Sequence, residues 1–240
     1  MKDKVKYILE FPIEEIGEDI NKEPDIIGLK FKGNSNEIEA LKKLLPRIKA
    51  PLMIKGCGDE EVDKSFLPQI INILDRECLI GIINENNYKS IVPSIIKGNH
   101  KAIIRTPIDI NLAKEMNILT SELGLPLDKI LIDTDIGGLG YGFEYGYSIM
   151  EKIKIEGNSG DKYLNMPLIS FATEETAKSK EAKDPNLSLY LEITSASAIK
   201  AAGADYIVLT KPEAVSVMKG LVWQNYQDYK YLNTFLQQKN

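Results

Sequence analysis

The chain has 240 residues, of which 43% are apolar and 27% charged, so it is long enough to bury a substantial core. Its net charge of −5 argues against nucleic acid as a main partner. It contains no apolar run of the roughly 18 residues that a membrane span needs, and the opening MKDKVKY does not resemble a signal peptide. We therefore expect a cytoplasmic protein that contacts neither nucleic acid nor membrane.

Short runs rich in β-branched residues recur along the chain, and most are continuously apolar, which is typical of strands buried on both faces of a parallel sheet. Eight such runs are bounded by turn residues: Val5–Phe11, Ile26–Phe31, Pro51–Lys55, Cys78–Ile83, Ala102–Thr106, Ile130–Thr134, Pro167–Ala172 and Tyr206–Thr210.

Segments with helical periodicity separate these runs. In the longest, Asp109 is expected to cap the helix N-terminus and Gly124 to end it, and Gly203 is expected to end the last crossover helix. The first connection, from Pro12 to Pro24, has room for only a short helix. Strand–helix alternation allows a doubly wound sheet or a closed barrel. Eight strands and the lack of GxGxxG after the first favour a single (β/α)8 TIM barrel over residues 1–220.

Residues 221–240 differ in composition from the barrel, because aromatic residues crowd among amides there. We expect a C-terminal tail helix packed under the barrel, with an oligomer contact as the alternative. The aromatic residues are Trp223, Tyr226, Tyr229, Tyr231 and Phe235.

In a barrel of this kind the functional face lies at the carboxyl ends of the strands. The residues expected to surround it are Glu10, Lys30, Lys55 to Gly58, Asn84, Arg105, Thr106, Asp133, Asp135, Thr173, Thr210 and Lys211.

The residue types missing from this face limit its chemistry. The only histidine, His100, precedes the fifth strand and is expected on the surface at the opposite rim. A Ser–His or Cys–His nucleophile pair and an imidazole-bound metal are therefore not predicted. The loops after the last two strands carry Glu174 and Glu175, which we expect to repel an anion, so a sugar-phosphate enzyme is disfavoured.

Several mouth residues allow two interpretations. Asp133 and Asp135 are either a paired general acid and base or caps of neighbouring loop N–H groups. Asn84 either binds a ligand amide or caps the following helix. Cys57 stands between two glycines, but its acidic neighbours disfavour a reactive thiolate. Cys57 and Cys78 lie near opposite rims and are expected as free thiols.

A glycine-rich turn follows the sixth strand. It contains Gly138 and Gly140 and is flanked by Tyr141, Tyr145 and Tyr147. Glycines allow close backbone approach and aromatic rings give a large contact area, so this turn suits a flat ligand or another protein. The predicted chemistry of the mouth is shape and hydrogen bonding, with no catalytic residue assigned.

Seven segments together resemble the small (delta) subunit of the corrinoid iron–sulfur protein of the CO dehydrogenase/acetyl-CoA synthase system. The resemblance runs from about Val5 to Gly220. In chain order the seven segments are PDIIGLKF, PLMIKGCGDEEVDKSFLP, ENNYKS, RTPIDINLAKEMNIL, GLPLDKILIDTDIGGLGYGFEYGYSIMEKI, GDKYLNMPLIS and AGADYIVLTKPEAV. The fourth and fifth are the most specific, because they contain the long runs DINLAKEMNIL and GGLGYGFEYGYSIMEKI.

This resemblance implies a TIM barrel that holds no cofactor of its own. It implies a partner, the large subunit, that carries a corrinoid and a [4Fe–4S] cluster, with the barrel mouth facing the corrinoid. It also implies transient contacts with a pterin methyltransferase and with acetyl-CoA synthase. The residues expected to face the corrinoid or a pterin are Asn84, Thr106, Asp133, Asp135, Gly138, Gly140 and Tyr141.

Two other functions stay open at this point. The fold also resembles pterin-dependent methyltransferases, so the chain could act alone on methyltetrahydropterin through Asn84 and Asp133. A repurposed barrel that binds an unrelated small molecule is the third possibility. Compared with this family, we expect the chain to lack a long N-terminal extension and to carry a shorter insert after Asp184. If these parts contact the large subunit in the family, we expect this chain to dock differently or to serve outside the usual complex.

Overall fold

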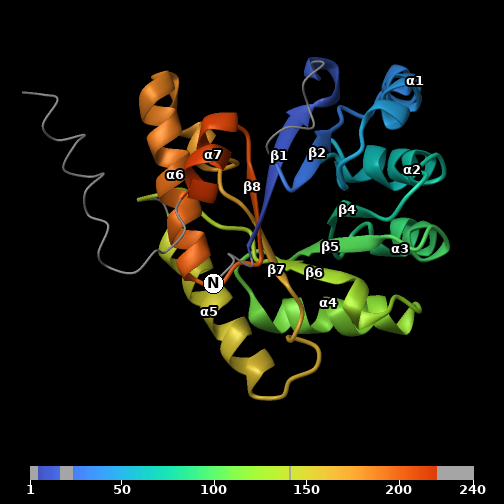
Figure 1. Cartoon of the computed structure of the whole chain (residues 1–240). Coiled ribbons are helices and arrows are strands. Elements are labelled where there is room, and N and C mark those ends of the chain that lie inside the picture. Colours follow the sequence, from blue (N-terminus) through green and yellow to red (C-terminus); the bar gives the residue numbers. More distant parts are fainter. Residues whose placement is uncertain (1–4, 17–23, 141, 221–240) are drawn as a thin grey trace, which may run out of the picture.

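The computed structural model describes residues 5–16, 24–140 and 142–220. Eight parallel strands pair in chain order and close into a barrel, because the last strand also pairs with the first (Figure 1). The strands are β1 (Lys6–Pro12), β2 (Ile26–Lys30), β3 (Leu52–Lys55), β4 (Cys78–Ile83), β5 (Lys101–Arg105), β6 (Ile130–Asp133), β7 (Leu168–Phe171) and β8 (Tyr206–Leu209). The predicted (β/α)8 fold and all eight predicted strands are confirmed, and no strand end differs from its predicted position by more than one residue.

Helices alternate with the strands and cover the outside of the barrel (Figure 1). They are α1 (Ser35–Leu44), α2 (Glu60–Ile71), α3 (Tyr88–Lys97), α4 (Ile110–Glu122), α5 (Phe143–Asn158), α6 (Pro185–Ala201) and α7 (Pro212–Gly220). The predicted cap is confirmed, since the Asp109 carboxylate accepts N–H bonds from Asn111 and Leu112 at the start of α4. Gly124 and Gly203 follow their helices with positive φ angles of 100° and 98°.

Between β1 and β2 the described residues form only the short 3-10 helix η1 (Ile13–Glu15). This agrees with the short helix predicted for that connection. The predicted tail helix, 221–240, lies outside the described residues, as does Tyr141.

The barrel has two hydrophobic layers. The larger one packs the outward faces of the strands against the helices. The smaller one fills the barrel interior, and four of its members, Ile8, Met53, Ile103 and Ile169, come from the odd-numbered strands. In TIM barrels, side chains of alternate strands form such layers of four. The residue two positions further along each odd strand therefore belongs to the next interior layer, at the mouth.

His100 is not a surface residue, which corrects the expectation from sequence. The residue is 2% exposed at the base of the barrel, and its ring Nδ1 accepts the N–H of Cys78 at 3.2 Å. The residue sits between the end of α3 and the start of β5, where the chain turns inward to enter the sheet. Both cysteines are free, as predicted.

Burial lowers the pKa of His100, and this gives the barrel base a testable pH dependence. The unfolded chain takes up a proton near pH 6.5 and the folded chain does so only at lower pH, so stability falls as the pH drops below about 6.5. We expect the free energy of unfolding of His100→Asn to fall less than that of the wild type between pH 7 and pH 5. Urea unfolding at both pH values measures this, and an equal fall in the two proteins would contradict it.

Candidate functional site

The mouth layer of the barrel is charged. Glu10, Lys55, Arg105 and Phe171 stand two residues beyond the four apolar side chains of the odd strands. Lys55 Nζ lies 3.1 Å from a Glu10 carboxylate oxygen and 4.5 Å from the centre of the Phe171 ring. The Arg105 guanidinium lies 4.9 Å from the same ring. Two cations thus contact one aromatic side chain, an arrangement favourable to each of them.

Carboxylates from neighbouring elements complete an ion network around these cations. Arg105 Nε donates to Asp133 at 2.6 Å, and a terminal nitrogen of Arg105 lies 2.8 Å from Glu174. Glu174 also pairs with Lys55, and Asp135 lies 3.9 Å from Arg105. Glu174, which we expected to repel an anion together with Glu175, is thus paired with both Lys55 and Arg105.

Asp133 is the most deeply buried member of the network, at 1% exposure. Burial raises its pKa to about 6, and the adjacent Arg105 offsets part of that effect. The same carboxylate accepts the N–H of Asp135, whose φ of 49° turns the chain sharply after β6. Burial opposes ionisation of Glu174 too, but there Arg105 and Lys55 outweigh it and lower the pKa. The loop-capping interpretation of Asp133 is thus realised, together with an ion pair.

Asn84 has its side-chain amide engaged within the mouth loops. Its Oδ1 accepts N–H bonds from Asn86 and Asn87, and its Nδ2 donates to Glu60 at the start of α2. Asn84 thus caps the turn that leads into α3, whose own N-cap is Asn87, and ligand binding by Asn84 stays a prediction.

The remaining predicted residues lie at the same end of the barrel. The Thr106 hydroxyl is buried without a hydrogen-bond partner among the described residues. Gly138 packs near Glu175, and a Cβ placed there would meet Glu175 at 3.6 Å. Gly140 has a positive φ of 78° and open space around it. Burial raises the pKa of the Cys57 thiol, in line with the prediction against a reactive thiolate.

Buried acids on the covering helices hold three of the mouth loops. Glu37 accepts N–H bonds from Lys32, Gly33 and Asn34, and Asp63 accepts those of Cys57 and Gly58. Glu192 accepts those of Thr210 and Lys211. Sequence reasoning missed these three acids, although Asn34 and Glu37 are the ends of a capping box, a pattern readable from sequence.

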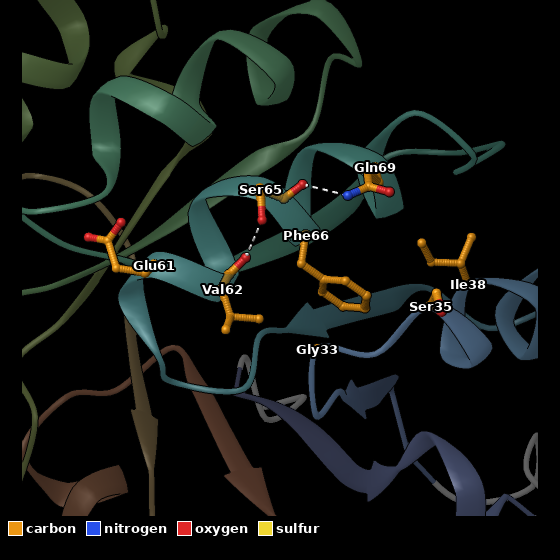
Figure 2. Close-up of a pocket in the computed structure, with 8 residues that line it drawn as sticks. All are labelled: Gly33, Ser35, Ile38, Glu61, Val62, Ser65, Phe66 and Gln69. Atoms are coloured by element: carbon orange, nitrogen blue, oxygen red, sulfur yellow. Dashed lines mark hydrogen bonds between the residues drawn. The ribbon is translucent and has the colours of Figure 1, made fainter.

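A separate hollow of about 460 Å³ lies on the outer wall between α1 and α2 (Figure 2). Phe66 and Ile38 face it, and two of its polar side chains bond within α2: Ser65 donates to the Val62 carbonyl and Gln69 to the Ser65 carbonyl. Among the described residues no group of three or more His, Cys, Asp or Glu side chains is arranged to hold a metal ion. No helix in the described part of the chain is long and apolar enough to cross a membrane.

The structure is a TIM barrel, and its fold is similar to that of dihydropteroate synthases. Dihydropteroate synthase from Xanthomonas albilineans with 4-aminobenzoic acid matches 92% of this chain and 93% of its own, with a TM-score of 0.67 at 9% identity. The Thermus thermophilus enzyme gives a TM-score of 0.61 at 12% identity, covering 91% and 93%. At these identities the likeness shows the fold alone.

The chain belongs to the CO dehydrogenase/acetyl-CoA synthase delta subunit family, whose model matches residues 6–230. It is 27% identical over 202 residues to the acetyl-CoA decarbonylase/synthase complex subunit delta of Methanocaldococcus jannaschii, covering 80% of this chain and 49% of that protein. The Archaeoglobus fulgidus subunit is 28% identical over 205 residues, covering 77% and 44%. The chain thus spans about half the length of the curated relatives it matches.

Proposed function

We propose that this chain is the barrel subunit of a corrinoid iron–sulfur methyl carrier. Its mouth would shield a corrinoid held by the large subunit while a methyl group passes from methyltetrahydropterin to acetyl-CoA synthase. The observation that carries the proposal is the family match over residues 6–230. A pterin methyltransferase and acetyl-CoA synthase would be transient partners.

The residues of this chain favour cofactors on the partner. A [4Fe–4S] cluster requires about four thiolate ligands, and this chain has two cysteines. Cys78 is buried at the start of β4, at the opposite end of the barrel from Cys57. The sole histidine is buried at the barrel base, so it cannot offer an imidazole to cobalt at the mouth. The chain's own contribution would be a rigid polar surface.

Exposed apolar side chains at the mouth suit the docking of such a partner. Tyr145, in the first turn of α5, is 63% exposed, and Ile108, in the loop after β5, is 39% exposed. Ile155, on the same helix as Tyr145, is 62% exposed. It lies ten residues further along the helix than Tyr145, about 15 Å closer to the base of the barrel. The two α5 side chains form a matched pair that separates mouth docking from general loss of apolar surface.

We expect Tyr145→Asp to weaken binding to the corrinoid subunit at least tenfold, and Ile155→Asp to leave it within about twofold. A buried charge at an interface lacks compensation, whereas an exposed one stays solvated. Co-purification followed by corrinoid absorbance and a binding titration measures both. A chain that never retains a corrinoid- and cluster-containing protein would overturn the proposal, and equal effects of the two variants would overturn docking through the mouth.

The second candidate is a free-standing methyltetrahydropterin-dependent methyltransferase. Asp133, a buried carboxylate at the end of β6, supports it, whereas the amide of Asn84 is committed to loop bonds. Calorimetry of the isolated chain with methyltetrahydrofolate decides the matter. Heat that is lost in Asp133→Asn would support this candidate, and no heat at millimolar ligand would remove it.

A further inference from the structure

Lys55 and Arg105 form a pair of cations that share one aromatic neighbour and one carboxylate. They come from β3 and β5, both contact the face of Phe171, and Glu174 bridges them. The side chains of Lys55 and Arg105 are 7% and 18% exposed. A carboxylate placed between them is therefore bound by two charge-assisted contacts in a partly dehydrated setting, where such contacts are strong.

The carboxylates around these cations differ in how firmly they are held. Glu10 and Asp133 are parts of strands β1 and β6, and each is at least nine-tenths buried. Glu174 lies in the loop between β7 and the 3-10 helix Thr176–Lys178, and its side chain is 26% exposed. Removal of Glu174 would leave Lys55 with Glu10 and Arg105 with Asp133, so the strands need not change. Asp135, in the loop after β6, lies 3.9 Å from Arg105 and does not bridge the two cations. Glu174 is therefore the bridging carboxylate that a ligand can replace.

We propose that Lys55, Arg105 and Phe171 form a binding site for the carboxylate of a small organic molecule, and that Glu174 occupies this site in the unliganded chain. The ligand carboxylate takes the place of the Glu174 carboxylate, which moves with its loop to solvent. Thr173, the residue before Glu174, has a buried hydroxyl without a hydrogen-bond partner among the described residues, and it supplies a further donor.

The charge balance of the network selects a monoanion. Glu10, Asp133, Asp135 and Glu174 are four acids around two cations, so the network already carries more negative than positive charge. Exchange of one carboxylate for another leaves that balance unchanged. A phosphate dianion would add a negative charge beside Asp133, which is buried and cannot be screened by water.

The test is an acetate titration of the isolated chain at constant ionic strength, kept constant with sodium chloride. Thermal unfolding and the NMR signal of the Arg105 Nε–H report binding. In the wild type the tethered Glu174 competes with acetate at an effective concentration on the order of millimolar or higher. We expect Glu174→Ala to bind acetate with a dissociation constant at least tenfold lower than that of the wild type. The midpoint temperature of its thermal unfolding, which we expect to be lower than that of the wild type, should rise again in part as acetate is added.

Two further variants keep the result interpretable. Glu174→Gln fills the same space without the charge, and it is expected to bind acetate more tightly than the wild type even if Glu174→Ala does not fold. Glu175→Ala removes the neighbouring acid, which pairs with Lys178 on the surface, and is expected to respond to acetate as the wild type does. Inorganic phosphate at pH 7.5 is expected to bind Glu174→Ala at least fivefold more weakly than acetate.

Acetate binding to Glu174→Ala and Glu174→Gln no tighter than to the wild type would overturn the site. Phosphate binding as tightly as acetate would overturn the carboxylate class. The inference goes beyond the proposed function, and the assay uses this chain without a corrinoid partner. A failed acetate titration would thus leave the methyl-carrier proposal standing, and a failed co-purification would leave this site standing.

Discussion

Replacement of Arg105 by Met is expected to destabilise the barrel by about 3–5 kcal/mol at pH 7.5. The guanidinium pairs with Asp133 and Glu174 and lies near Asp135, and its loss leaves the Asp133 carboxylate buried without a cation. Breaking a buried pair by removing one partner costs this much because the remaining charge cannot reach water. Urea unfolding of wild type and variant gives the difference directly.

The pH dependence of this loss provides an internal check. Burial already places the pKa of Asp133 at about 6 in the presence of Arg105, and without the cation it rises further. A carboxyl group with a raised pKa in the folded state contributes stability at low pH that is lost as the pH rises through that pKa. The destabilisation by Arg105→Met should therefore be smaller at pH 5 than at pH 7.5.

The double variant Arg105→Met/Asp133→Leu should recover much of the loss of stability caused by Arg105→Met alone. Purely additive effects of the two substitutions on the free energy of unfolding would contradict the account.

Glu192→Ala is expected to destabilise the barrel by about 2–4 kcal/mol. Glu192 on α6 is fully buried and accepts the N–H groups of Thr210 and Lys211, where β8 ends at the mouth. Its loss leaves these donors without an acceptor, at roughly 1–3 kcal/mol for each buried group. Thermal or urea unfolding measures the loss.

Two variants serve as controls for this result. Glu192→Gln keeps one acceptor oxygen and should cost less than Glu192→Ala. Lys211→Met removes the partner cation and should cost less than Glu192→Ala, because the N–H groups of Thr210 and Lys211 still stabilise the buried Glu192 carboxylate. Equal losses of stability in Glu192→Ala and Glu192→Gln would contradict this account. They would show that Glu192 stabilises the barrel through its negative charge and not as a hydrogen-bond acceptor for the loop N–H groups.

Much of the fold could be predicted from sequence because strands buried on both faces appear as continuous apolar runs. Cys78–Ile83 is reproduced to the residue, and Ile130–Asp133 differs by one residue from the run seen in sequence. The position of Asp109 before an amphipathic segment was enough to identify the start of α4. Strand ends also placed Glu10, Lys55, Arg105 and Asp133 at the mouth.

The pairings inside the mouth could not be predicted from the same information. Glu174 sits on a loop, and loop geometry decides that it crosses to Lys55 and Arg105 instead of facing solvent. Glu192 lies in α6, whose apolar residues do not mark out one clear face, so the pattern of residues around it does not predict that it is buried. His100 was misplaced because a lone polar residue before a strand is usually exposed, whereas here its ring packs beneath Gly98 and accepts a backbone N–H.

The central claim is that the mouth of this barrel faces a corrinoid-carrying partner. Hydrogen–deuterium exchange of the chain, with and without the corrinoid iron–sulfur subunit, tests it most directly. We predict slower exchange in the mouth loops at residues 134–140 and 172–176 when the subunit is present, and unchanged exchange at the base, residues 97–101. Slower exchange at the base alone, or no change at either end, would contradict the claim.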